Sequence, residues 1–237
     1  MKSCLFNPEP CVLVVDDHAI SRQHTVQALL SVTRLVHQAG NGAEAMVCSL
    51  RLLPDLIFLD IRLPDTCGLS LLKRIRQAWP RGKPHPAIVI LSGDDSDLVK
   101  QKAEQSEVNA ILIKPVPFYE IRNIAVRLLH LEQGVEEGSA LLKAEGPQAG
   151  LRELFLTELE NRVPQLDRKI SSLDWISATD LTHQLIASCA LCQERNLEFH
   201  CRQLHQRLST KSPARRVAHA YYSFLKAVDH LRIELQT

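Results

Sequence analysis

Three short apolar runs in this sequence each end at charged residues. The runs are 11–15, followed by Asp16 and Asp17, 56–59, followed by Asp60, and 110–113, followed by Lys114. Runs of this kind are typical of strands buried on both faces of a parallel sheet, whose carboxyl ends meet at one edge. Three carboxylates at one edge repel each other unless a divalent cation and a lysine are present. The pattern therefore predicts a metal site with oxygen ligands.

The residues around these runs predict repeated βα units. Short apolar runs alternate with amphipathic stretches, which is typical of parallel strands joined by helices. The predicted strands are 11–15, 34–38, 56–60, 87–92 and 109–113. The predicted helices are 19–31, 42–51, 68–78, 95–105 and 117–131. Together they predict one three-layer α/β domain at residues 10–131.

The remainder of the chain has a different organisation. Residues 132–149 contain three glycines, a proline and an excess of acidic residues, which predicts a linker. From residue 150 to residue 237 the apolar residues recur at helical spacing, without a β pattern. The predicted helical segments are 151–163, 166–173, 176–191, 197–208 and 217–235. We therefore expect an all-α domain, an antiparallel bundle of four or five helices, at residues 150–237.

Composition limits the classes of function. The net charge is +1 for the whole chain and +2 for residues 150–237, so we expect no nucleic-acid partner. We find no apolar stretch of about eighteen residues and no signal-peptide core, so we expect a cytoplasmic protein without a membrane partner. The seven cysteines predict reduced, buried thiols. Cys189 and Cys192 form a C-x-x-C without a second pair, so we expect no metal site there.

The charged residues of the first domain occur in a recognisable order. The motif residues are Asp16-Asp17, Asp60 with Leu63-Pro64 and Gly68, Ser92-Gly93, and Lys114-Pro115. Over residues 10–131 they resemble the receiver (CheY-like) domain of two-component response regulators. The resemblance implies a flavodoxin-like fold with strand order 2-1-3-4-5. It also implies that Asp60 accepts a phosphoryl group from a partner's phosphohistidine.

Phosphoryl transfer to a carboxylate explains the other motif residues. A Mg²⁺ ion held by Asp17 and Asp60, by Asp16 through water, and by the backbone carbonyl of Arg62 would neutralise the site. Lys114 would pair with a second phosphoryl oxygen and the Ser92 hydroxyl would donate to a third. Taken singly, an aspartate at a strand end is more often a helix cap and a lysine more often a solvated charge. Their joint order favours the functional interpretation.

Two further features concern switching and phosphate lifetime. Receivers commonly have an aromatic residue three positions before the lysine, where this sequence has Ile111. We therefore expect any switching to use Ser92 and the surface of strands 4 and 5. As a hypothesis, Arg62 and Asp94 form an ion pair that shields the acyl phosphate from water. The alternative is that both side chains are simply exposed, because surface pairs contribute little.

The helical half contains a second motif. Asp174-Trp175 is followed by Asp180 to Ala187, and then by Leu197, Cys201 and Leu204 at helical spacing. Over residues 150–237 this is similar to the histidine phosphotransfer (HPt) domain, and it implies that His183 is the phosphorylated imidazole. We expect His183 to project near Thr179, Ile186 and Ala187, opposite the inward-facing residues Leu181, Leu185, Ser188 and Cys192.

The family's lysine is replaced by Ile186, which removes a cation from the phosphoryl group. The remaining histidines of this half lack such a setting and are expected to have no role. They are His200, His205, His219 and His230.

These resemblances imply a phosphorelay signalling protein rather than an enzyme with a substrate cleft. Asp60 would receive phosphate from a sensor or hybrid histidine kinase, and His183 would exchange it with a receiver, its own or another protein's. The alternative is an adaptor whose degenerate HPt-like bundle binds a partner without transferring phosphate. A DNA-binding regulator is disfavoured because residues 150–237 show no helix-turn-helix pattern.

Overall fold

The structure is a computed structural model that describes residues 9–93, 107–131, 149–210 and 212–234. The packing of the chain divides it into two compact units, residues 1–143 and 144–237. The division falls inside the predicted linker 132–149, most of which lies outside the described residues.

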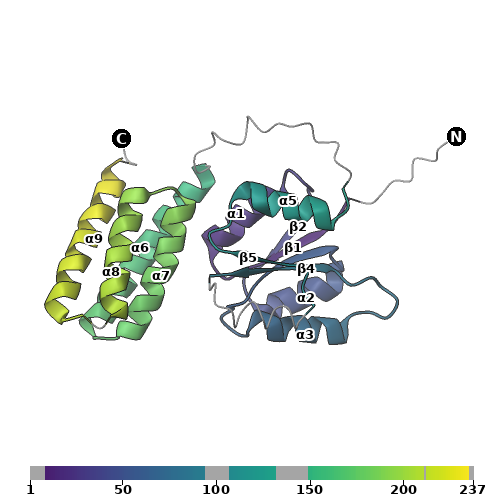
Figure 1. The fold of residues 1–237 in the computed structure, drawn as a ribbon, viewed down its shortest axis with the longest axis horizontal. Coiled ribbons are helices and arrows are strands. Elements are labelled where there is room, and N and C mark those ends of the chain that lie inside the picture. The colour runs from purple at the N-terminus through teal and green to yellow at the C-terminus, as the bar shows by residue number, and fades with distance from the viewer. Residues whose placement is uncertain (1–8, 94–106, 132–148, 211, 235–237) are drawn as a thin grey trace. The chain divides into compact units, whose positions relative to one another are not determined.

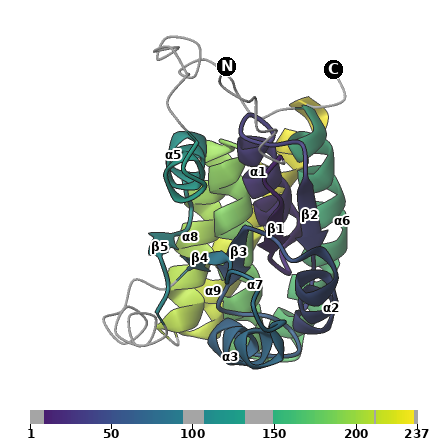
Figure 2. The ribbon, with the colours of Figure 1, turned by 90° about the vertical axis from the view of Figure 1, so that its right-hand side faces the viewer.

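The first unit is built on a five-stranded parallel sheet. The strands are β1 (Val12–Val15), β2 (Val36–Ala39), β3 (Leu56–Asp60), β4 (Ala87–Ser92) and β5 (Ala110–Ile113). Their order across the sheet is β2-β1-β3-β4-β5, as Figure 2 shows, and every neighbouring pair is parallel. The predicted flavodoxin-like α/β fold and its strand order are confirmed.

Helices cover both faces of this sheet (Figure 1). One face carries α1 (Ala19–Leu29) and α5 (Phe118–Leu128), and the other carries α2 (Gly42–Leu52) and α3 (Gly68–Ala78). Alternate residues of β1 and β3 enter opposite cores, so Phe58 packs beneath α1 and α5 while Ile57 and Leu59 pack beneath α2 and α3. Because both faces of these strands are buried, their sequences are continuously apolar.

The second strand begins later than its sequence predicts. β2 starts at Val36, whereas the predicted strand starts at residue 34. The backbone N–H of Arg34 donates to a carboxylate oxygen of Glu9 at 2.5 Å, and that of Leu35 donates to Thr33 Oγ1 at 3.1 Å. Because side chains accept from these two amides, the amides make no hydrogen bonds to the neighbouring strand. The predicted helix 95–105 lies outside the described residues.

The second unit consists, in its described part, of four helices that pack side by side. They are α6 (Ala149–Ser171), α7 (Trp175–Leu191), α8 (Arg195–Ser209) and α9 (Ala214–Glu234). Each helix packs against the next in the chain, and the Tyr221 hydroxyl of α9 donates to the Asp167 carboxylate of α6 at 3.1 Å. Phe155 and Phe224 are its largest fully buried side chains. Among the described helices of both units, none is long and apolar enough to span a membrane.

Two predictions for this unit are wrong. The predicted helical segment 166–173 extends past the end of α6 at Ser171, so Leu173 is exposed and adopts a positive φ of 58° in the turn that follows. Leu181 is only half-buried, whereas its neighbour Thr182 is fully buried. The inward face of α7 passes through Ala178, Thr182, Leu185 and Cys189, at steps of three and four residues.

Candidate functional site

The strand ends bring the predicted charged residues to one edge of the sheet. The N–H of Asp16 donates to the carbonyl of Ala39 at 3.1 Å, which fixes the position of Asp16 beside β2. Asp60 is the last residue of β3. The N–H of Lys114 donates to the carbonyl of Ser92 at 2.7 Å, so Lys114 extends β5 alongside the end of β4. Parallel strands in this register place the side chains of Asp16, Asp60 and Lys114 at the carboxyl edge of the sheet, together with the adjacent Asp17.

Lys114 connects two of the carboxylates. Its Nζ donates to Asp16 Oδ2 at 2.7 Å and also to Asp60 Oδ2. Asp16, Asp17 and Asp60 each offer an oxygen that lies within 4.8 Å of the others. Asp16 is fully buried and Asp60 is 7% exposed, whereas Asp17 lies at the exposed rim. The cluster thus combines two buried carboxylates with one that faces solvent.

Further hydrogen bonds fix both buried carboxylates. Asp16 Oδ2 accepts from the Ser21 hydroxyl at 2.6 Å, and Asp16 Oδ1 accepts from the backbone N–H of His18 at 2.9 Å. Asp60 Oδ1 accepts from the backbone N–H of Arg62 at 2.8 Å. His18, which follows Asp16-Asp17, is the N-cap of α1. The hydrogen bond from Ser21 of α1 to Asp16 is a contact that the motif did not predict.

The electrostatics of the cluster are uneven. Burial by itself would raise the pKa of Asp16, but the Lys114 charge and the donated hydrogen bonds outweigh it, so this pKa is lowered. Burial and the neighbouring Asp16 raise the pKa of Asp60 and of Asp17. Burial opposes the charge of Lys114, yet its two carboxylate partners raise its pKa. One lysine faces three carboxylates, so an excess of negative charge remains.

This donor set fits a hard divalent cation. Mg²⁺ prefers carboxylate and carbonyl oxygens and keeps several waters, which suits a cluster that is open on the Asp17 side. Arg62 is exposed, and its side chain has no ion pair with any residue that the structure describes. The proposed partner Asp94 lies outside the described residues, so the expected Arg62–Asp94 pair stays a hypothesis.

Ser92 and Gly68 shape the surroundings of Asp60. Ser92 ends β4 and is buried, next to the strand that ends at Asp60. Gly68 begins α3, and its N–H donates to the carbonyl of Ile61 at 2.8 Å. A Cβ atom at this glycine would overlap the carbonyl oxygen of Asp60. Ile111 packs against the core beneath α2 and α3, where it has no ring that could rotate toward the site.

The second motif lies on α7. Asp174 caps this helix, accepting from the N–H of Ser177 at 3.2 Å and from Lys169 Nζ at 2.9 Å. These hydrogen bonds lower the pKa of Asp174 to about 2. His183 lies at the middle of α7 and is exposed, with Thr179, Ile186 and Ala187 one turn away along the same helix. The structure therefore displays this imidazole on the surface of the helical unit.

His205 is a neighbour of His183 that the sequence did not reveal. The two rings lie 5.7 Å apart between centroids, and His205 Nδ1 lies 3.1 Å from the hydroxyl of Thr182. Nothing in the sequence indicated these contacts, and the expectation that His205 has no role stays a prediction. The spacing that places Cys201 and Leu204 in the core also turns His205 toward α7, but the register between the two helices is needed to see it.

The C-x-x-C thiols face different partners. Cys189 Sγ lies 4.0 Å from Cys201 Sγ, and Cys192 Sγ lies 3.8 Å from the carbonyl of Leu151. The described cysteines are all free, as predicted. Contact with Cys201 together with burial raises the pKa of Cys189, and burial raises that of Cys192 to about 12. Both side chains are protonated thiols near neutral pH and pack as small core residues.

Comparison with known proteins identifies the first unit. Residues 12–126 match the family described as the response regulator receiver domain. A protein-glutamate methylesterase/protein-glutamine glutaminase of Archaeoglobus fulgidus is 35% identical over 101 residues, which cover 42% of this chain and 28% of that protein. The sensory/regulatory protein RpfC of Xanthomonas campestris pv. campestris is 26% identical over 203 residues, covering 73% of this chain and 27% of that protein.

A solved CheY-like receiver domain from Methylobacillus flagellatus is 26% identical and covers 51% of this chain and 99% of its own, with a TM-score of 0.45. The chain spans less than a third of the length of the first curated relatives. With the sheet order and the acidic edge already established, the family match makes the N-terminal unit a receiver domain of the two-component response regulators.

Proposed function

We propose that Asp60 is the phosphoryl acceptor of this receiver domain and that Asp16, Asp17 and the backbone carbonyl of Arg62 complete a Mg²⁺ site with it. The observation that carries the proposal is the double contact of Lys114 with Asp16 and Asp60 at the open, acidic edge of the sheet. A bound Mg²⁺ would supply positive charge against the phosphoryl oxygens as they approach the carboxylates. Asp17, at the rim, is the carboxylate best placed to meet a hydrated cation.

Asp60, Lys114 and Ser92 each have a different role in the proposed phosphoryl transfer. An oxygen of Asp60 forms the new bond to phosphorus while the bond to the donor's imidazole nitrogen breaks, and the imidazole leaves with that electron pair. Lys114 keeps its bond to Asp16 and exchanges its contact with Asp60 for one with a phosphoryl oxygen. Ser92, at the end of the adjacent strand, donates its hydroxyl to another oxygen.

For the helical unit we propose an HPt-like four-helix bundle at residues 150–237, joined to the receiver (10–131) by the linker 132–149. Two observations support it. His183 is exposed at the middle of α7, downstream of the capped Asp174-Trp175 turn. The similarity to RpfC covers 73% of the chain, whereas the first unit holds 143 of its 237 residues, so the similarity extends into the second unit.

In this proposal a sensor or hybrid histidine kinase phosphorylates Asp60, and His183 exchanges phosphate with a receiver domain. His205 offers a nearby imidazole that can take over part of the role of the lysine replaced by Ile186. When the Thr182 hydroxyl donates to the carbonyl of Ala178 or Thr179, its oxygen can accept the Nδ1–H of His205.

A second candidate function is a phosphorylation-controlled adaptor, in which the helical unit binds a partner protein without carrying phosphate. Ile186, half-buried on α7 one turn from His183, is the observation that favours it. In this version Asp60 is still phosphorylated, and His183 is only a surface residue.

The two functions differ in the chemistry of the label. The full chain is incubated with Mg²⁺ and phosphoramidate, or with a phosphorylated histidine kinase, as wild type and as Asp60→Asn, His183→Gln and Asp65→Asn variants. The relay predicts a base-labile acyl phosphate that only Asp60→Asn removes, and an acid-labile, base-stable label that only His183→Gln removes directly. Asp65, an exposed carboxylate of the same loop that binds the α2 N-terminus, is the matched control.

An acyl phosphate in the wild type, with no base-stable label in either the wild type or Asp60→Asn, would establish the adaptor. A wild-type chain that takes no label from either donor would contradict both functions.

A further inference from the structure

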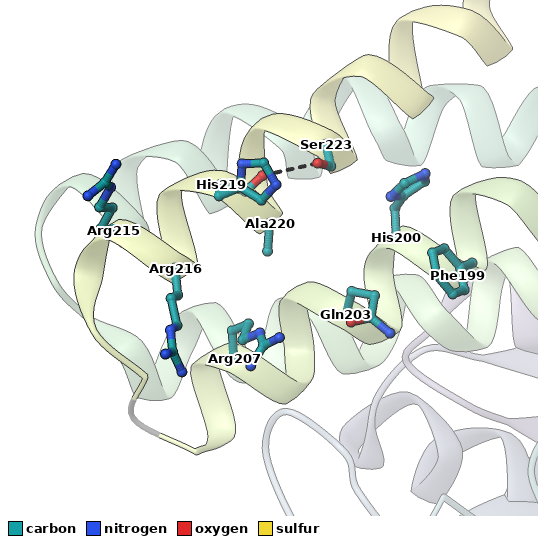
Figure 3. Close-up of a pocket in the computed structure, with 9 residues that line it drawn as sticks. All are labelled: Phe199, His200, Gln203, Arg207, Arg215, Arg216, His219, Ala220 and Ser223. Atoms are coloured by element: carbon teal, nitrogen blue, oxygen red, sulfur yellow. Dashed lines mark hydrogen bonds between the residues drawn. The ribbon is translucent and has the colours of Figure 1, made fainter.

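A groove of about 640 Å³ lies between α8 and α9 of the helical unit (Figure 3). Its volume falls within the range of roughly 300 to 1,000 Å³ that is typical of small-molecule sites. The described residues that line it include three arginines and two histidines, and none of them carries a carboxylate. The groove shares no lining residue with the surroundings of His183 and His205, so it is separate from the proposed phosphotransfer site.

One end of the groove is cationic. Arg207 lies in the last turn of α8, and Arg215 and Arg216 lie in the first turn of α9, on either side of the connecting turn (Figure 3). Within the described residues none of these three guanidinium groups pairs with a carboxylate. The first turn of a helix is the positive end of its dipole, which disfavours cations and favours anions. Arg207 and Arg216 extend toward each other between the two helices, whereas the Arg215 side chain points to the other side of α9 (Figure 3). The guanidinium groups of Arg207 and Arg216 are therefore suited to phosphate groups.

The other end of the groove is aromatic. Phe199 is 58% exposed, and its ring meets that of His200 edge to face at a centroid distance of 5.3 Å. His200 and Arg207 are seven residues apart on α8, which is about 10.5 Å along the helix axis. The aromatic end thus lies about two helical turns from the cationic end, a separation similar to that between the base and the terminal phosphate of a nucleotide.

The middle of the groove is left open by small residues. Ala220 and Ser223 of α9 line it, and the Ser223 hydroxyl donates to the carbonyl of His219 at 3.1 Å, which holds it against its own helix (Figure 3). Gln203 of α8 faces them and adds an amide that can donate to and accept from a sugar. The groove therefore has a polar centre between its two unlike ends.

We propose that this groove binds a nucleoside di- or triphosphate. Arg207 and Arg216 hold the phosphates, and the base lies against Phe199 and His200. A simple phosphate ion would leave the aromatic end unused. A nucleic acid strand would need a longer basic track than this unit, with a net charge of +2 over residues 150–237, provides.

Binding of a fluorescent N-methylanthraniloyl ADP to the full chain, measured by anisotropy in EDTA and 0.15 M salt, tests the proposal. EDTA removes cations that would draw phosphates to the acidic edge of the receiver. We expect Arg207→Gln with Arg216→Gln to weaken binding by roughly 10- to 100-fold, because each lost charge-assisted hydrogen bond accounts for about tenfold in affinity. Arg202→Gln is the matched control, because Arg202 lies on α8 outside the groove and pairs with Glu198. It should change affinity less than about twofold.

Competition separates the two ends of the ligand. ADP and ATP should displace the probe, adenosine should not, and Phe199→Leu should weaken ADP several-fold while leaving inorganic triphosphate unchanged. The proposal is overturned if the probe does not bind at concentrations up to millimolar, or if Arg202→Gln weakens binding as much as the double arginine variant does. It is also overturned if inorganic triphosphate competes as well as ATP and Phe199→Leu leaves the affinity for ADP unchanged. A single-stranded oligonucleotide that displaces the probe far better than ATP would overturn it as well. None of these results bears on phosphorylation of Asp60 or His183.

Discussion

The two candidate phosphoacceptors of this chain are held in opposite ways. Asp60 is nearly buried at a strand end, where Lys114, the N–H of Arg62 and two other aspartates surround it. His183 is exposed on a helix, with His205 as a neighbouring ring. The aspartate thus sits in a site assembled from three strands, whereas the histidine is presented by one helix and supported by a second.

This difference reflects the chemistry of each group. A carboxylate must meet three phosphoryl oxygens that repel it, so it needs fixed positive charge and a cation around it before transfer. A neutral imidazole meets no such repulsion and mainly needs access for a partner's surface. We therefore expect the receiver site to be sensitive to loss of its charged neighbours and the helical site to tolerate such losses.

The largest expected effect is on stability at the receiver site. Lys114→Met leaves the buried Asp16 without its counter-charge and should lower the free energy of unfolding of the first unit by about 3 kcal/mol. Lys169→Met removes an exposed pair with Asp174 in the helical unit and should lower the free energy of unfolding much less, because solvent screens exposed ion pairs. Urea unfolding of both variants measures the contrast. Equal losses would show that the two ion pairs are not held differently.

The next effect concerns the lifetime of phosphate on His183. His205→Leu removes the neighbouring imidazole and should shorten the half-life of the base-stable label roughly 3- to 10-fold, as expected for one lost hydrogen bond. His230→Leu is the control, since His230 lies on α9 in an exposed pair with Glu234. An unchanged half-life in His205→Leu would mean that His205 does not stabilise the phosphate on His183.

The smallest effect is a difference in pH response between the units. Burial lowers the pKa of His24, outweighing its hydrogen bond to the carbonyl of Val116, so the unfolded chain binds a proton more readily than the folded one. Stability of the first unit should therefore fall as pH decreases below about 6.5, the ordinary value for histidine. The pKa of Asp174 is lowered to about 2, so its contribution is present above about pH 4 and is lost between about pH 4 and pH 2.

Thermal unfolding between about pH 2 and pH 8 checks both windows. His24→Gln should flatten the profile of the first unit between about pH 5 and pH 7, and Asp174→Asn should flatten that of the second unit below about pH 4. A profile of the first unit that His24→Gln leaves unaltered would place its acid sensitivity elsewhere.

The strands and the charged residues that follow them could be predicted because a strand buried on both faces needs a continuous run of apolar residues, which is visible in the sequence. Each apolar run of β1, β3 and β5 stops at a residue that points into the acidic edge. The start of β2 could not be predicted in this way, since Glu9 and Thr33 take up two amides through side-chain bonds that have no periodic pattern.

Features that depend on the register between two helices escaped the sequence. His205 meets His183 only because α7 and α8 pack at one particular register, and the groove exists only because Arg207, near the end of α8, faces the start of α9. Similarly, Leu181 has the right residue type for a core position but lies beside the inward face of α7 and is only half-buried. Helical spacing predicts a face, whereas the neighbour of that face is set by tertiary packing.

Gly68 restricts movement on one side of the acidic site. Because its N–H is bonded to Ile61 and it has no side chain to separate α3 from the peptide of Asp60, the first turn of that helix rests directly on the acceptor's backbone. Asp60 and the start of α3 must then shift together or not at all. We therefore expect a change of charge on the carboxylate to move the opposite side of the site, where Ser92 ends β4 and Lys114 follows β5, on the side of the sheet farthest from β2.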